Sequence, residues 1–193
     1  MGALTTALDF LLTTLFQLYI AVVILRFLLQ WARADFYNPF SQFVIKITTP
    51  LVRPLRRFIP GFGGWDLATL VLAWLLTMLQ VVLVGTQISQ FTIPGLLDGQ
   101  SLNLFSVVLI SLVDLFALTV SLFIIAIIIQ ALSSWFNPGQ YNPLTAALYS
   151  LTEPLLRPAR RLLPPISGVD LSPLLVLLAL QVLKMLVVTL VLG

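Results

Sequence analysis

Four long apolar stretches divide the chain, and each is long enough to cross a lipid bilayer. They run over about residues 4–31, 67–88, 102–132 and 171–192, and none contains more than two formally charged side chains. A membrane-spanning helix needs about 20 mostly apolar residues, because each residue adds about 1.5 Å along the helix axis. The pattern predicts an all-α integral membrane protein with four transmembrane helices.

The chain also repeats itself at a constant spacing of 104 residues. The matched positions include Trp31 with Trp135, Asn38-Pro39 with Asn142-Pro143, Pro50 with Pro154, Arg56-Arg57 with Arg160-Arg161, and Asp66 with Asp170. We therefore expect a first repeat over residues 1–88, a linker over 89–101 and a second repeat over 102–193. Each repeat contains two spans, so both should enter the membrane in the same direction, as tandem parallel repeats.

An amphipathic segment lies between the two spans of each repeat. Its apolar residues recur at steps of three and four, which is the period of one helix face. They are Phe40, Phe43, Val44, Ile47, Leu51, Leu55 and Phe58 in the first repeat, and Leu144, Ala147, Leu148, Leu151, Leu155, Ala159 and Leu162 in the second. We expect an interfacial helix in each repeat, with its apolar face among acyl chains and a break at Pro50 or Pro154. A re-entrant arrangement is the alternative.

The opposite face of each segment is rich in arginine. These residues are Arg53, Arg56 and Arg57, and their counterparts Arg157, Arg160 and Arg161. They either fix the orientation of the protein in the bilayer or bind anionic headgroups or a protein partner in the cytoplasm. Nucleic-acid binding is not expected, because the basic cluster has no accompanying fold for reading bases.

The distribution of charge predicts the orientation. Eight of the ten Lys and Arg residues lie in the two loops that contain the amphipathic segments. By the positive-inside rule these loops face the cytoplasm, which places both termini and the linker in the periplasm. The linker contains Asp98 and no basic residue, in agreement with this orientation.

The composition limits the chemistry that the chain can perform. Hydrophobic residues make up 60% of it and charged residues 9%, far from the balance of a soluble domain. The chain has no Cys and no His, which removes the thiolate nucleophile, the commonest metal ligand and the commonest general base. We therefore expect no catalytic residues, no metal and no cofactor.

Ionisable groups inside the spans are costly to bury, so each is a candidate for function. Asp114 and Lys184 lie at similar counted depths and are predicted to form a buried ion pair. Arg26 lies close to the end of its span, so its side chain should reach the cytoplasmic headgroups. Asp66 and Asp170 precede the second span of each repeat and should cap these helices.

A polar stripe runs along the first span. It consists of Asp9, Thr13 and Gln17, and it could face Thr69, Thr77 and Gln80 of the second span. Gln80 occupies the position that matches Lys184 in the second repeat. The stripe either holds the helices together by hydrogen bonds, or forms a path for water, protons or a cation with Asp9 and Asp114 as its acids, or binds a ligand.

Three strings of the second repeat resemble a known family repeat. They are Thr152-Glu153-Pro154-Leu155-Leu156-Arg157-Pro158, Arg160-Arg161-Leu162-Leu163-Pro164-Pro165 and Gly168-Val169-Asp170-Leu171-Ser172-Pro173, and they are similar to the YGGT repeat. The first half carries the same repeat with Thr49 in place of Glu153 and Ala68-Thr69 in place of Ser172-Pro173. The resemblance covers nearly the whole chain as two copies. It implies a multi-pass bacterial inner-membrane protein of the YggT family, which is related to the YlmG proteins.

The resemblance implies two classes of function. Roles in that family include osmotic and ion tolerance in some bacteria, and effects on division or nucleoid distribution in others. We therefore expect a non-enzymatic protein of osmotic or ion homeostasis, acting as an oligomeric channel-like or regulatory component. The alternative is a scaffold that recruits a cytoplasmic or membrane partner through its duplicated Arg-rich segments. The family has no established catalytic residues to assign to this sequence.

Overall fold

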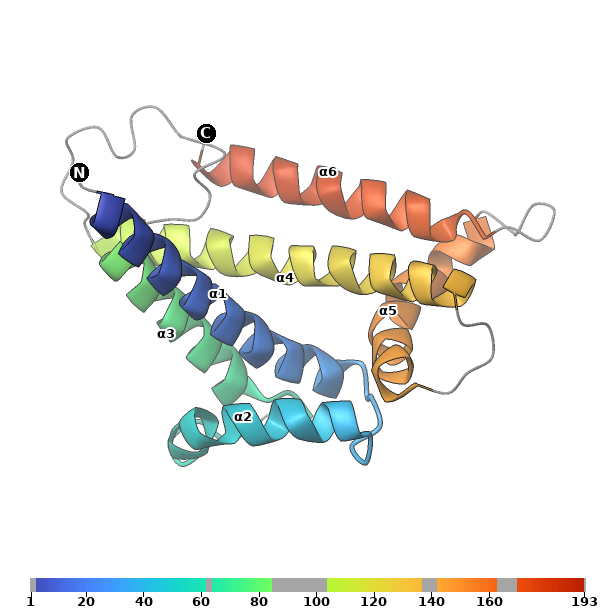
Figure 1. Cartoon of the computed structure of the whole chain (residues 1–193), viewed down its shortest axis with the longest axis horizontal. Helices are drawn as coiled ribbons and strands as arrows, with labels where there is room; N and C mark the ends of the chain where they lie inside the picture. The colour runs from blue at the N-terminus through green and yellow to red at the C-terminus, as the bar shows by residue number, and fades with distance from the viewer. Residues whose placement is uncertain (1–2, 62–63, 85–103, 137–141, 163–169, 193) are drawn as a thin grey trace.

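A computed structural model describes residues 3–61, 64–84, 104–136, 142–162 and 170–192. These residues form six α-helices and, within the described ranges, no strand. The helices are α1 (Ala3–Trp31), α2 (Pro39–Leu55), α3 (Leu67–Val84), α4 (Leu104–Phe136), α5 (Pro143–Leu162) and α6 (Ser172–Leu192). The predicted all-α class is confirmed. Helices α4 to α6 repeat the order of α1 to α3 (Figure 1). In each repeat a helix of mixed polarity lies between two apolar ones.

Three helices are long and apolar enough to cross a membrane. Their candidate spans are Phe10–Trp31 in α1, Leu104–Ser133 in α4 and Ser172–Leu192, which is the whole of α6. The apolar part of α3 is shorter and covers Leu67–Leu83. The predicted second span extends to residue 88, and residues 85–88 lie outside the described ranges. The three long helices and the composition indicate a membrane protein.

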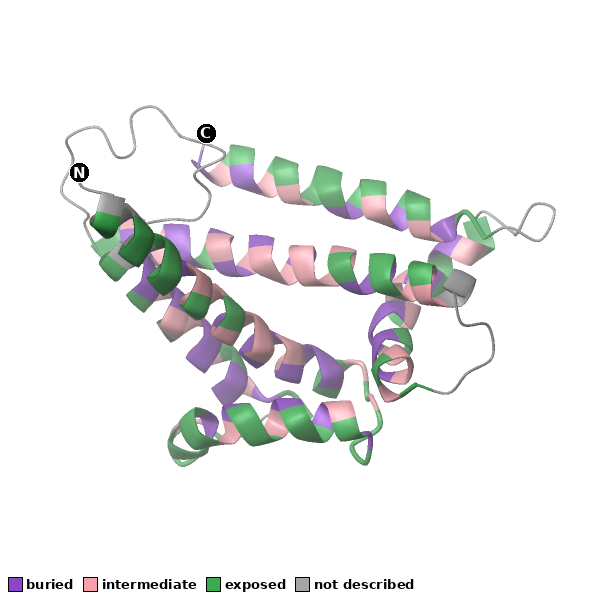
Figure 2. Cartoon of the chain, viewed as in Figure 1, coloured by how far each residue is buried: buried purple, intermediate pink, exposed green. Residues whose placement is uncertain are grey.

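Packing joins the helices in the order α1, α3, α4, α6. Helix α3 contacts both α1 and α4, and α6 packs along α4 (Figure 1). The largest core cluster includes Ile20 and Val23 of α1, Leu72 of α3 and Leu115 of α4, all of them buried. Most of the outward surface of α6 is exposed (Figure 2). In a membrane this apolar surface would contact lipid rather than water.

The two repeats run in the same direction through the molecule. The first turns of α1 and α4 and the last turns of α3 and α6 gather at one end, whereas α2 and α5 lie towards the other (Figure 1). This arrangement agrees with tandem parallel repeats, because each repeat leaves that end, reaches its amphipathic helix and returns.

The apolar side of α2 is divided between two environments. Ser41, Val44, Thr48 and Val52 are buried, with Val44 packed against Leu29 of α1. Other predicted apolar positions remain exposed, namely Phe43, Ile47 and Leu51. The prediction that one apolar face lies among acyl chains is therefore wrong for Val44. It is also wrong for the buried residues of the corresponding face of α5, namely Ala147, Leu148, Leu151 and Ala159. Hydrophobic periodicity alone does not distinguish a face that contacts protein from one that contacts lipid.

The prolines do not break the amphipathic helices as predicted. Helix α2 continues through Pro50 and Pro54, and α5 continues through Pro154 and Pro158. A proline removes one backbone donor, so a helix packed along its length can retain its other hydrogen bonds. The packing of α2 on α1 and of α5 on α4 explains why the predicted interruption is absent.

Candidate functional site

Matched arginine–aspartate pairs join each amphipathic helix to the apolar helix that follows it. In the first repeat, Arg56 at the C-terminal end of α2 donates hydrogen bonds from Nε and Nη2 to Asp66, just before α3. In the second, Arg160 Nε donates to Asp170 Oδ2 at 3.0 Å. The two pairs occupy positions related by the 104-residue repeat. Each one ties the end of the amphipathic helix to the beginning of its neighbour.

Asp66 is buried, and both oxygens of its carboxylate accept hydrogen bonds. It accepts from the backbone N–H of Thr69 at 3.3 Å, from the Thr69 hydroxyl and from Arg56. Burial by itself would raise the pKa of the Asp66 carboxyl, but the donors from Arg56 and Thr69 outweigh it and lower the pKa. The bond to the Thr69 N–H confirms that Asp66 caps α3.

Asp170 has the same role in a more exposed setting. It accepts from the backbone N–H of Ser172 at 2.9 Å and from the Ser172 hydroxyl, so the predicted cap of α6 is confirmed. Desolvation by itself would raise the pKa of the Asp170 carboxyl, but the hydrogen bonds from Ser172 and Arg160 together outweigh it and lower the pKa. Arg160 also pairs with Glu153 on α5, with Nη1 and Oε2 2.9 Å apart.

Arg26 points into the protein rather than towards headgroups, so the prediction for this residue is wrong. Its side chain is buried, and Nη1 donates to Thr48 Oγ1 at 2.8 Å and to Thr49 Oγ1 at 3.2 Å. Its Nε lies 3.8 Å from Asp66 Oδ2. The reason is geometric, because α2 packs beside the last turns of α1 and places acceptors within hydrogen-bond distance of the guanidinium.

The second repeat has a hydrogen bond at the positions that match Arg26 and Thr48, but an amide takes the place of the guanidinium. Gln130 occupies the position that matches Arg26, and its Oε1 accepts from the hydroxyl of Thr152, which matches Thr48. Thr48, Thr152 and Gln130 were not among the predicted site residues. The 104-residue spacing was the signal that could have found them, because it places both contacts at the same pair of positions.

The N-terminal ends of α2 and α5 are joined directly. Asn38 Oδ1 accepts from the N–H of Phe40 at 2.8 Å and so caps α2, while Asn38 Nδ2 donates to the carbonyl of Pro143 in α5 at 2.7 Å. Asn142 caps α5 in the same way, accepting from the N–H of Leu144 at 2.9 Å. The amphipathic helices therefore touch each other across the repeat boundary.

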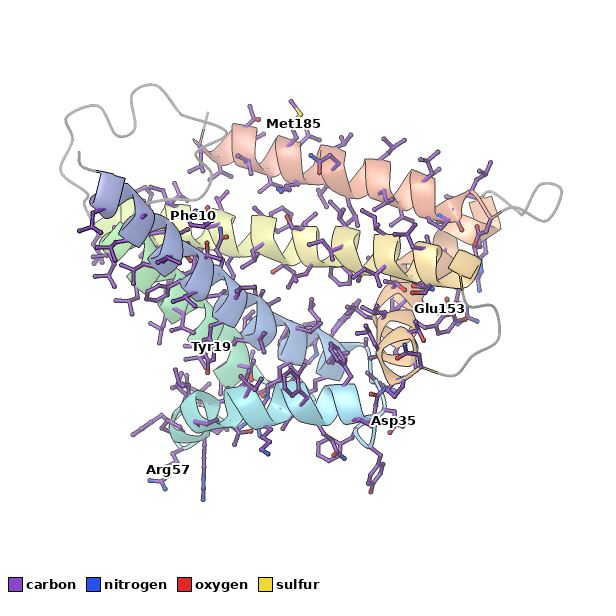
Figure 3. The ribbon with its side chains drawn as sticks, in the orientation of Figure 1. Phe10, Tyr19, Asp35, Arg57, Glu153 and Met185 are labelled. Carbon is purple, nitrogen blue, oxygen red and sulfur yellow. The ribbon has the colours of Figure 1, made fainter. Side chains whose placement is uncertain are left out.

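Four of the six predicted contact arginines remain free at the surface. Arg53, Arg57, Arg157 and Arg161 are exposed and form no ion pair or hydrogen bond with other described residues. Figure 3 shows Arg57 at the outer edge of the molecule, beyond the end of α2. Arg56 and Arg160 instead serve mainly to hold the helices together.

The predicted ion pair between Asp114 and Lys184 does not form. Lys184 Nζ donates to Ser121 Oγ at 2.9 Å, and the described ion pairs do not include Asp114. In antiparallel helices this register places Asp114 seven residues, about 10 Å, nearer the N-terminal end of α4 than Ser121. Helix α4 extends beyond the end of α6, so residue counts from the helix ends did not give equal depths (Figure 1).

The polar stripe of the first repeat lies partly inside the α1–α3 pair. Thr13, Thr77 and Gln80 are buried, and Gln17 is half-buried. Gln17 and Gln80 match Ser121 and Lys184, the pair that bonds in the second repeat. The side chain of Asp9 lies outside the described part of the chain. Among the described residues no three acidic side chains gather as a metal site would require.

Comparison with known proteins identifies the family. The CCB3/YggT family model matches residues 5–87 and again 109–191. The two matches are offset by 104 residues, which confirms the tandem repeat. The chain belongs to the CCB3/YggT family.

Relatives match this chain over nearly its whole length. It is 43% identical to the uncharacterized protein PA0392 of Pseudomonas aeruginosa over 188 residues, covering 97% of this chain and 91% of that protein. It is 40% identical to the uncharacterized protein YggT of Escherichia coli K12 over 181 residues, covering 92% and 87%. No solved structure matches.

Proposed function

We propose that this protein is a non-enzymatic scaffold of the bacterial inner membrane that presents two matched Arg-rich helices to an acidic partner in the cytoplasm. The observation that carries the proposal is the repeated bracing of α2 and α5. The Arg56–Asp66 and Arg160–Asp170 pairs hold these helices in place and leave Arg57 exposed in the first repeat. In the second repeat Arg161 is exposed at the position that matches Arg57.

The proposal includes a four-span topology. The span predicted from the sequence over residues 67–88, whose described part is α3, would cross the bilayer together with α1, α4 and α6. The Arg-rich helices would then face the cytoplasm, and both termini would face the periplasm. Support for this orientation comes from the clustering of basic residues and from the position of α2 and α5 towards one end of the molecule (Figure 1).

Photocrosslinking from the ends of the amphipathic helices tests the scaffold role. Phe58 and Leu162 occupy matched positions and are 85% and 75% exposed, so a photoreactive phenylalanine analogue at either should leave the fold intact. We expect both sites to capture the same acidic protein in intact cells. The same analogue at Leu190, which is 86% exposed at the far end of α6, should not capture it.

The effect of arginine substitutions on crosslinking distinguishes specific binding of the partner from chance collision. Replacing Arg57 and Arg161 with Gln should abolish both adducts, because neither residue has a described structural partner. Adducts that persist in this variant, or that differ between the two sites, would count against the proposal.

A second candidate function, in osmotic or ion homeostasis, is favoured by the buried polar groups between α1 and α3. The buried side chains of Thr13, Thr77 and Gln80 provide hydrogen-bonding groups between the apolar helices α1 and α3. If this function holds, purified protein in liposomes should conduct ions, and replacing Asp9 and Asp114 with Asn should remove the flux. Flux no greater than that of empty liposomes would leave the scaffold as the better account.

A further inference from the structure

A cavity of about 580 Å³ lies between the end of α1 and the adjoining face of α2. Small-molecule sites in proteins commonly have volumes of about 300–1,000 Å³, so this one can hold a ligand headgroup. Its walls combine three arginines, Arg26, Arg53 and Arg56, with apolar side chains that include Phe36 and Val52. The cavity is thus cationic in one part and apolar in another.

The charge of the cavity favours an anion. None of its lining residues is acidic, and Asp66, which pairs with Arg56 and lies 3.8 Å from Arg26, is the one carboxylate in contact with its arginines among the described residues. Three guanidinium groups against one carboxylate leave an excess of two positive charges. Arg53 has no described partner of its own, so its guanidinium is free to bind a ligand.

An unpartnered buried hydroxyl also points to a ligand. Ser41 lines the cavity and is 4% exposed, yet its Oγ makes no hydrogen bond. A buried hydroxyl without a partner costs free energy, and a bound acceptor oxygen would remove that cost. Arg26 uses Nη1 and Nε in its described contacts, and Nη2 takes part in none of them.

The surroundings of the cavity favour a ligand with a hydrophobic tail. Phe36 on the cavity wall is 62% exposed, and on α2 Phe43 and Ile47 are 59% and 37% exposed. Such a surface beside a cationic cavity suits a molecule whose head is anionic and whose tail is apolar. We propose that the cavity between α1 and α2 binds the phosphate headgroup of an anionic phospholipid, with Arg26, Arg53 and Ser41 as donors.

The second repeat lacks the features that this site requires. Gln130 stands where Arg26 stands, and Glu153 stands where Thr49 lines the cavity. Two arginines there, Arg157 and Arg160, face two carboxylates, because Arg160 pairs with both Glu153 and Asp170. The site therefore belongs to the first repeat alone, and the second repeat supplies a matched control within the same chain.

Lipid binding to the purified full-length protein in detergent tests the proposal. Native mass spectrometry would measure binding of phosphatidylglycerol, of phosphatidylcholine with the same acyl chains, and of inorganic phosphate. We expect phosphatidylglycerol to bind at least about tenfold more tightly than phosphatidylcholine. Arg53→Gln should weaken that binding about fivefold, and the matched Arg157→Gln should leave it unchanged. Thr49→Glu should weaken it more, because it adds the carboxylate found in the second repeat.

Each other outcome would overturn the proposal. Equal binding of the two lipids would show that the site does not select an anionic headgroup. Equal losses of binding in the Arg53→Gln and Arg157→Gln variants would show that the site is not specific to the first repeat. Inorganic phosphate that binds as tightly as phosphatidylglycerol would make this a site for free phosphate rather than lipid. Thermal unfolding without added lipid controls for folding, and Arg53→Gln should match the wild type there. Crosslinking from Phe58 and Leu162 reports on the scaffold separately.

Discussion

At the residue scale, Asp66 and Asp170 occupy matched positions but should contribute differently to the free energy of unfolding. Both carboxylates cap a helix and pair with an arginine ten residues earlier. Asp66 is buried beside a second, buried arginine, whereas Asp170 is exposed. Removing a charge from a buried pair leaves the partner uncompensated, but an exposed partner is still solvated by water.

We therefore predict that Asp66→Asn destabilises the protein much more than Asp170→Asn. Asparagine keeps the cap in both variants, so the comparison isolates the charge. The expected loss is about 3 kcal/mol for Asp66→Asn and under about 1 kcal/mol for Asp170→Asn. Titration of the detergent-solubilised protein with dodecyl sulfate would measure the free energies of unfolding. Equal losses would contradict the burial argument.

The stabilisation by Asp66 should also depend on pH. The folded pKa of its carboxyl lies below the unfolded value of about 3.9. The ionised group therefore contributes fully above that value, and its contribution is lost as the pH falls through the folded pKa. Unfolding measured from pH 7 to pH 3 should show a constant gap between the wild type and Asp66→Asn down to about pH 5, and a narrowing gap below about pH 4. A gap that stays constant to pH 3 would refute this assignment.

At the scale of elements, the amphipathic helices are parts of the folded protein rather than loose membrane anchors. Each is capped by an asparagine, tied to the preceding apolar helix through Thr48 or Thr152, and tied to the following one through an arginine–aspartate pair. Helix α5 has the larger buried face, which includes Leu148, Leu151 and Leu156. Both helices are thus held in fixed positions on the folded protein.

Asn38→Asp should separate the capping of α2 from its contact with α5. Aspartate keeps the oxygen that caps the helix but lacks the N–H₂ that donates to Pro143, so the hydrogen bond between α2 and α5 is lost. We expect a loss of about 1–2 kcal/mol in the free energy of unfolding. Asn142→Asp is the matched control and should be nearly neutral, because its described contact is the cap alone. Similar losses in both variants would show that the link between α2 and α5 is unimportant.

At the scale of the whole molecule, the two repeats form one structure. Helix α3 packs on α4, the amphipathic helices touch, and the central core draws residues from both repeats. The repeats nevertheless differ at a few positions, such as Arg26 and Gln130, which give the first repeat its cationic cavity. A duplicated architecture can therefore support one shared role and one role specific to a single repeat.

Reporter fusions would test the four-span topology. An enzyme that is active only outside the cytoplasm should be silent when fused after Gln140 and active when fused after Gly99, because basic loops stay in the cytoplasm. Activity at Gln140 with silence at Gly99 would contradict the proposed topology, either because the orientation is reversed or because α3 does not cross the membrane. Activity at neither position or at both would mean that α4, which lies between the two fusion points, does not cross the membrane.

The sequence by itself determined the helical class, the long apolar helices, the tandem repeat and the capping aspartates. These features follow from hydrophobic length, constant spacing and local hydrogen bonding, which are all written along the chain. The tertiary structure decided the direction of Arg26, the partner of Lys184, the divided surface of α2 and the cavity between α1 and α2. These features depend on which helices pack together and in what register, and hydrophobic periodicity does not specify either one.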